Sequence, residues 1–133
     1  MAAHMAARRP EGAALSGAER AALRDLLGAE RERTTARVAA LLRDWEGIVE
    51  SSALVATDDE HDPEGSSTAF ERAHVQALLD QARSHLADLD AAQARLRDGD
   101  YGVCQGCGRP ISPERLKVRP AAKSCVPCAT AHR

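Results

Sequence analysis

Two pairs of cysteines near the C-terminus constrain the fold of this chain more than any other feature. They are its only cysteines and lie at Cys104, Cys107, Cys125 and Cys128. Two residues separate the members of each pair and seventeen separate the pairs, which is the spacing of a structural zinc site. Four thiolates fill a tetrahedral coordination sphere, so we predict one structural Zn²⁺ with no open position. We therefore do not expect an enzyme.

Two other uses of the cysteines are compatible with their spacing alone. Two disulfides would need an oxidising compartment, and the opening residues do not have the pattern of a signal peptide. A redox C-x2-C pair usually accompanies a strand–helix pattern, which does not precede Cys104. His132 could in principle replace one cysteine, but we expect it to be a solvated tail residue. Zinc binding is the favoured interpretation.

The chain has too few large side chains to build a thick core. Its 133 residues include one tryptophan, one tyrosine and one phenylalanine, and alanine supplies much of the apolar fraction. Such a composition suits long helices that pack along narrow alanine–leucine seams. No apolar stretch approaches the roughly 18 residues that span a membrane. We therefore expect a cytoplasmic protein without a membrane partner.

The segment from Ser16 to about Leu54 has the pattern of one long amphipathic helix. Glu19 lies three residues after Ser16, which predicts a capping box at the start of the helix. Large apolar residues then recur at steps of three and four, which places them on one face. They are Leu23, Leu26, Leu27, Val38, Leu41, Leu42, Trp45, Ile48 and Val49.

A second helix is predicted from another capping box, Thr68 with Glu71, to about Arg97, with Gly99 as its left-handed cap. Its apolar stripe comprises Val75, Leu79, Ala82, Leu86, Leu89 and Leu96. Three polar residues fall on the seam between the helices and are expected to reduce the burial there: Thr34, His85 and Gln93. Two helices of about 30 residues with one apolar face each form an antiparallel hairpin about 45 Å long.

The predicted fold is therefore mainly α. It consists of a long antiparallel helical hairpin (coiled coil) followed by a small four-cysteine zinc-finger domain. We expect residues 1–15 to be a disordered N-terminal segment and residues 16–99 to form the hairpin. Residues 100–133 are expected to hold the zinc finger with a short C-terminal helix and tail.

The break between the helices, residues 57–65, holds five carboxylates in nine residues. Pro63 and Gly65 are expected to stop helix propagation there. The simplest interpretation is a solvated acidic turn, and the order of its residues does not match an EF-hand loop. Like charges repel one another, so their concentration at the tip of an arm favours a function at an electropositive or metal-containing site.

Charge is unevenly divided along a chain with a formal net charge of −2. From Cys104 onward six basic residues accompany a single acidic one, Glu114, whereas the preceding part is acidic. A zinc ribbon that binds nucleic acid directly is therefore one alternative, although it would need a larger basic face and more aromatic residues than Tyr101. A plain coiled-coil adaptor is the other.

A series of short motifs follows the hairpin with its aspartate-rich tip. They are Asp100-Tyr101-Gly102-Val103-Cys104, Cys107-Gly108, Arg115-Leu116, Arg119-Pro120, Cys125 and Cys128. Together with the hairpin, these motifs resemble the DksA/TraR C4-type zinc-finger family. The resemblance covers roughly residues 20–130. Its C-terminal motif is the most specific part.

The resemblance implies a transcription regulator that binds bacterial RNA polymerase. Members of the family insert the coiled-coil tip into the secondary channel of the polymerase and do not recognise a specific DNA sequence. The tip residues directed at the polymerase active site would be Asp59, Asp62 and Glu64. The residues contacting the rim of the channel would be Arg115, Lys117 and Arg119.

Three positions depart from the family's pattern. Glu64 stands where the tip motif Asp-x-x-Asp-x-Ala has alanine. Ala129 and Asp88 stand where ppGpp-responsive members carry basic residues, although Arg119 matches a third such position. We therefore expect the dependence on ppGpp to be weak or absent.

Overall fold

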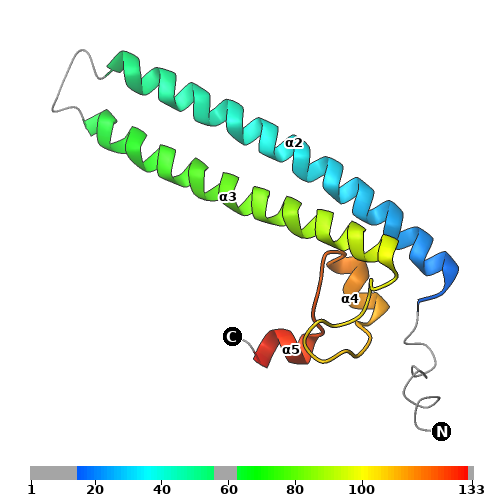
Figure 1. Cartoon of the computed structure of the whole chain (residues 1–133). Coiled ribbons are helices and arrows are strands. Elements are labelled where there is room, and N and C mark those ends of the chain that lie inside the picture. The colour runs from blue at the N-terminus through cyan, green and yellow to red at the C-terminus, as the bar shows by residue number, and fades with distance from the viewer. Residues whose placement is uncertain (1–14, 56–62, 132–133) are drawn as a thin grey trace, which may run out of the picture. The chain divides into compact units, whose positions relative to one another are not determined.

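The computed structural model describes residues 15–55 and 63–131, and the side chains of residues 15–51 and 67–131 (Figure 1). Four helices lie in these ranges: α2 (Gly17–Val55), α3 (Pro63–Asp98), α4 (Pro113–Val118) and α5 (Val126–Ala131). The only β pairing among the described residues is one antiparallel bridge, Val103 with Pro110. The mainly α prediction is confirmed. None of these helices combines the length and apolar character that crossing a bilayer requires.

The start of α2 confirms the predicted capping box. The Ser16 N–H donates to Glu19 Oε1 at 2.9 Å, and the Glu19 N–H donates to Ser16 Oγ at 3.0 Å. These bonds pair backbone donors that have no partner within the first turn of the helix. The backbone N–H of Ser16 also lowers the pKa of the Glu19 carboxyl. The helix ends at Val55, one residue beyond the predicted Leu54.

Ser16→Ala is expected to lower the free energy of unfolding by about 1 kcal/mol, because it leaves the Glu19 N–H without its side-chain acceptor. Urea denaturation followed by the far-UV signal measures this change. Ser67→Ala is the matched control, since Ser67 is exposed inside α3 and caps nothing. An equal loss of stability in the two variants would contradict a capping role for Ser16.

The second helix begins earlier than predicted. α3 starts at Pro63, so Thr68 lies inside the helix and the predicted second capping box is wrong. Proline is favoured at the first position of a helix because its missing N–H would have no partner there. The helix end is as predicted, with Gly99 at φ +88°. The N–H groups of Asp100 and Tyr101 donate to the Arg95 carbonyl at 2.9 and 3.2 Å, closing the last turn.

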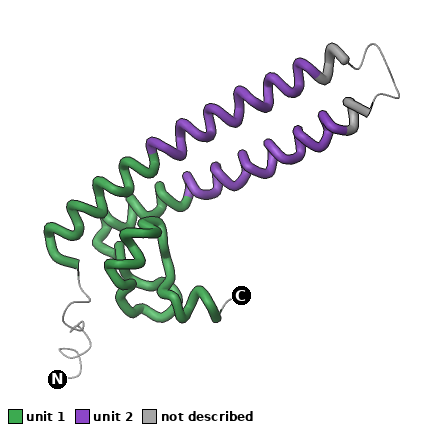
Figure 2. Tube along the Cα trace, turned by 180° about the vertical axis from the view of Figure 1, so that it is seen from behind, with its two compact units in different colours: residues 1–31, 88–133 green, residues 32–87 purple. Residues whose placement is uncertain are grey.

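The chain divides into two compact units (Figure 2). Unit 1 contains the chain up to Arg31 together with everything from Asp88 onward. Unit 2 comprises Glu32–Ala87. The helical segments that lead into the zinc finger are thus grouped with it. The division at residue 99/100 stays a prediction from the sequence.

In unit 2 the two helices pack antiparallel through a small cluster. Leu41 of α2 is buried against Leu79 and Ala82 of α3. Val38, Leu42, Val75 and Leu78 flank this cluster. The sequence predicts reduced burial at Thr34, yet this residue is only 5% exposed. A side chain this small fits the seam where two helices come close, so its polar nature does not keep it at the surface.

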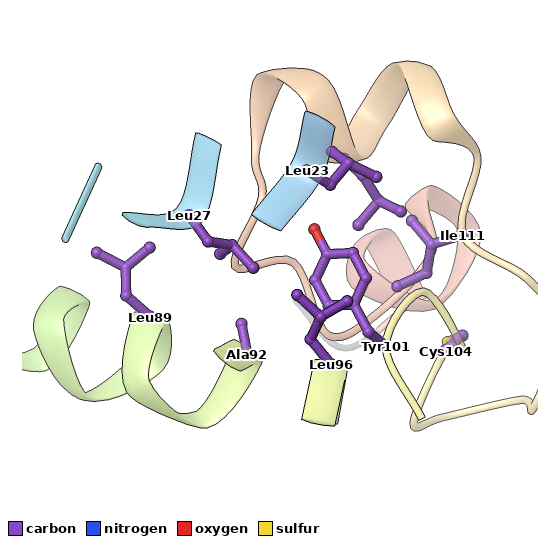
Figure 3. Packing of buried hydrophobic residues seen from close by; sticks show 9 residues of the cluster. Leu23, Leu27, Leu89, Ala92, Leu96, Tyr101, Cys104 and Ile111 are labelled. Atoms are coloured by element: carbon purple, nitrogen blue, oxygen red, sulfur yellow. The ribbon is translucent and has the colours of Figure 1, made fainter. Parts of the chain in front are cut away.

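Unit 1 has the larger core, which α2, α3 and the zinc-finger segment build together. Its helical part comprises Leu23, Leu27, Leu89, Ala92 and Leu96. The zinc-finger part comprises Tyr101, Cys104, Ile111 and Leu116. Figure 3 shows the Tyr101 ring between Leu96 and Ile111, with Cys104 at the edge of the same cluster. One of the four cysteines is therefore also a core residue.

Candidate metal centre and its surroundings

The four cysteines converge on one point. Their Sγ atoms all lie within 4.8 Å of one another, and those of Cys107 and Cys125 are 3.8 Å apart. Sulfurs that bind one Zn²⁺ tetrahedrally at about 2.3 Å lie about 3.8 Å from one another. A disulfide would need an S–S distance of about 2.05 Å. The donor set and its spacing therefore fit one structural Zn²⁺, as predicted.

A short hairpin carries the first pair of cysteines. The Cys104 N–H donates to the Arg109 carbonyl at 2.8 Å, and the Gly108 N–H donates to the Cys104 carbonyl at 2.9 Å. Gly108 takes φ +76°, in the left-handed region where a side chain is disfavoured. The chain thus turns tightly between the bridge residues Val103 and Pro110, and both sulfurs face the same side.

Gly106 leaves room for the sulfurs. Its N–H donates to Cys104 Sγ at 3.3 Å. A Cβ placed on Gly106 would come within 3.2 Å of Cys128 Sγ and 3.7 Å of Cys104 Sγ. Glycine therefore allows the backbone to approach the metal centre closely enough to hydrogen-bond a thiolate.

The second pair of cysteines lies at the start of α5. Cys125 directly precedes the helix and Cys128 lies within it, and the Ala129 N–H donates to the Cys125 carbonyl at 2.9 Å. The preceding residues are tied to the rest of unit 1. The Gln105 N–H donates to the Lys123 carbonyl at 2.8 Å, which joins the two cysteine turns directly.

Hydrogen bonds around the sulfurs shift the pKa values of Cys104 and Cys128 in opposite directions. The backbone N–H of Cys125 is the largest influence that lowers the pKa of Cys104 to about 6, and the N–H groups of Cys107 and Gly106 act in the same direction. Hydrogen bonding to Cys125 and the other cysteines raises the pKa of Cys128 to about 12. Thiols this close share protons, and a bound dication would replace those protons.

The helix α4 lies between the two pairs of cysteines in the sequence and was not predicted from it. Ser112 caps it by accepting a hydrogen bond from the Arg115 N–H at 3.2 Å, and Pro113 occupies the first turn. Leu116 is fully buried in the core of unit 1. A serine followed by proline is a helix-start signal that could have revealed this element.

Tyr101 is a core residue. It is 2% exposed, and its hydroxyl donates to the Pro120 carbonyl at 2.8 Å. Burial raises the pKa of this hydroxyl to about 12, so it remains a donor over the physiological range. The aromatic residue nearest to the cysteines is therefore not available for stacking on nucleic-acid bases.

The residues expected as rim contacts differ in their surroundings. Lys117 and Arg119 are exposed at the end of α4. Arg115 is half-buried, and its Nε donates to the Ser124 carbonyl at 3.0 Å. Of the expected tip residues, Asp59 and Asp62 lie outside the described residues. Glu64 lies in the first turn of α3, but its side chain is outside the described part.

Comparison with known proteins identifies the cysteine-containing segment. Residues 99–133 match the family described as prokaryotic dksA/traR C4-type zinc finger. The chain is 34% identical over 67 residues to the RNA polymerase-binding transcription factor DksA of Caulobacter vibrioides, covering 50% of this chain and 47% of that protein. It is 33% identical over 51 residues to DksA of Escherichia coli K12, covering 38% and 34%. The matching stretch thus spans half or less of these relatives.

A solved structure extends the similarity to the rest of the chain. The transcription factor DksA2 from Pseudomonas aeruginosa matches with a TM-score of 0.74 and 26% sequence identity. The match covers 99% of this chain and 95% of that protein. The similarity therefore includes the paired helices as well as the cysteine-containing segment.

Proposed function

Because residues 99–133 belong to the dksA/traR C4-type zinc-finger family, we propose that this chain binds bacterial RNA polymerase and regulates transcription. The observation that carries the proposal is the match to DksA2 over 99% of the chain, since it joins the zinc finger to the same pair of long helices. The relatives that match in sequence are named RNA polymerase-binding transcription factors. The proposed role is regulatory and involves no turnover.

In this proposal the hairpin delivers its acidic tip into the secondary channel of the polymerase. The acidic segment 57–65, with its five carboxylates, follows the end of α2 at Val55 and includes the first residues of α3, which begins at Pro63. Asp59 and Asp62 would act there by electrostatics and hydrogen bonding near the catalytic centre. Glu64, in place of an alanine, makes the tip more acidic than the family motif.

The exposed end of α4 is proposed as the contact with the rim of the channel. Lys117, Val118 and Arg119 form this α4-end surface. Val118, which lies between the two cations in the sequence, is 81% exposed. An apolar side chain between two cations suits a partner surface that combines carboxylates with an apolar contact.

Direct binding to nucleic acid is the less favoured function. Single-strand binding relies on exposed aromatic residues for stacking along a basic groove. Tyr101 is buried, and the chain carries a formal net charge of −2. Fluorescence anisotropy with labelled DNA, without polymerase, tests this function. Salt-dependent binding at low micromolar protein would favour it.

Asp62→Asn is expected to abolish the effect on transcription while leaving polymerase binding in place. The substitution keeps the size of the side chain and removes one negative charge from the tip, so contacts elsewhere remain. Co-purification with RNA polymerase measures binding, and run-off transcription measures the effect.

Asp44→Asn, which removes an exposed carboxylate within α2, is the matched control and should behave as the unmodified protein. If the unmodified chain does not co-purify with RNA polymerase, the proposed function itself is overturned. An unchanged transcriptional effect in Asp62→Asn would overturn the tip mechanism alone.

A further inference from the structure

Arg115 is hydrogen-bonded to the segment that carries the second pair of cysteines, whereas its basic neighbours are exposed. Its Nε donates to the Ser124 carbonyl at 3.0 Å in a partly buried setting. Ser124 directly precedes Cys125, one of the four metal-ligating cysteines. Lys117 and Arg119 on the same helix end are exposed. The side chain of Arg115 is therefore engaged within unit 1.

The bonded carbonyl belongs to a peptide group that also serves the metal centre. The Ser124 carbonyl and the Cys125 N–H are the two ends of one planar peptide and point in opposite directions. The Sγ atoms of Cys125 and Cys104 lie within 4.8 Å of each other, and the Cys125 N–H is the largest influence that lowers the pKa of the Cys104 thiol. A bond that fixes the carbonyl therefore also fixes the direction of the N–H.

We propose that Arg115 is a positioning residue for the zinc site, whose guanidinium orients the Ser124–Cys125 peptide so that its N–H meets Cys104 and Cys125 is held at the metal. The bond joins α4 to the second pair of cysteines, which follow α4 along the chain. This role concerns metal retention and goes beyond the proposed binding of polymerase.

The helix that carries Arg115 is well suited to this role. Ser112 caps the Arg115 N–H, so the backbone of the residue is fixed at the first turn of α4. Leu116, the next residue, is fully buried and anchors the helix in the core. Because the backbone of Arg115 is already fixed, its planar guanidinium loses little further conformational freedom when it binds the carbonyl. Groups that orient metal ligands typically contribute 10–100-fold to metal affinity.

The peptide group just before the bonded one is also held by a hydrogen bond. The Lys123 carbonyl accepts the Gln105 N–H at 2.8 Å, so the first cysteine turn holds the chain just before Ser124. This bond comes from the backbone and persists in any Arg115 variant. Removal of the guanidinium should therefore loosen the second pair of cysteines without unfolding the segment.

The test is Arg115→Met, which keeps an unbranched apolar stem and removes the donor. Transfer of zinc from the full chain to a chromogenic chelator measures retention, and the visible absorption of the cobalt(II)-substituted protein reports the geometry of the four sulfurs. We expect zinc affinity to fall by about 10–100-fold and the cobalt spectrum to change. Arg115→Lys, which can still donate to the carbonyl, should restore part of the affinity.

Lys123→Met is the matched control, because it removes an exposed positive charge two residues from Cys125 but no side-chain hydrogen bond. It should retain zinc as the unmodified chain does. The free energy of unfolding of the zinc-free protein in urea should be the same for Arg115→Met as for the unmodified chain. A general packing role for Arg115 would instead lower the stability of the zinc-free and the zinc-bound protein alike. Unchanged zinc retention in Arg115→Met, or an equal loss in Lys123→Met, would overturn the proposal.

Discussion

Cys104→Ser is expected to release the zinc and to unfold the segment that follows α3. Binding of a structural Zn²⁺ by four cysteines is worth about 10–16 kcal/mol near neutral pH. This free energy matches or exceeds the whole stability of a typical small domain, which is about 5–15 kcal/mol. Cys104 is also 1% exposed within the core of unit 1, so the substitution places a polar hydroxyl there as well. Zinc content and limited proteolysis after residue 100 measure the two effects.

A strong chelator added to the unmodified chain should reproduce the same cleavage pattern. Excess zinc should then reverse the effect in the unmodified chain but not in the variant, which lacks a ligand. The helices of unit 2 should keep most of their far-UV signal, since their cluster of Leu41, Leu79 and Ala82 includes no residue of the zinc finger. Full zinc content in Cys104→Ser would contradict a four-cysteine site.

Leu89→Ala is expected to lower the free energy of unfolding by about 2–5 kcal/mol. Leu89 is fully buried in the unit 1 core with Leu27 and Ala92, so removal of three carbons leaves a cavity in which the lost contacts are not replaced. Thermal unfolding followed by the helical signal at saturating zinc measures the change.

Phe70→Ala is the corresponding control at an exposed position. It deletes more atoms than Leu89→Ala, but Phe70 is 76% exposed on α3. We expect a change within about 0.5 kcal/mol, as for most surface substitutions. Comparable losses in the two variants would show that Leu89 does not lie in a tightly packed core.

The features that could be predicted from the sequence depend on neighbouring residues. The reciprocal bonds of Ser16 and Glu19 span three residues, and the positive φ of Gly99 is required by the turn that follows α3. The metal-ligating cysteines could be found because two tight turns supply all four sulfurs. In each case, local chemistry admits few alternatives.

The predictions that failed show where local chemistry does not decide. Thr68 and Glu71 have the spacing of a capping box, but a threonine can equally lie inside a helix that begins earlier. Pro63 is predicted to stop a helix, although its fixed φ also suits the first position of one. Proline ends a helix that precedes it but can begin a helix that follows it, and the sequence around Pro63 does not decide between the two.

Other features depend on residues that are distant in the sequence. The bond of Arg115 to the Ser124 carbonyl and that of Tyr101 to the Pro120 carbonyl exist only when α4 is folded against the cysteine turns. Charge alone groups Arg115 with Lys117 and Arg119, although residues two apart on a helix, such as Arg115 and Lys117, do not share a face. Only the folded arrangement separates the engaged guanidinium from the exposed side chains.

The single tyrosine and the single tryptophan of this chain lie in different compact units. Tyr101 is buried in the zinc-finger part of unit 1, and Trp45 is half-buried in α2 within unit 2. Each unit therefore carries its own intrinsic optical probe. Tyrosine absorbance can report loss of the metal-dependent core, while tryptophan emission reports separation of the helices, without any label or substitution in the chain.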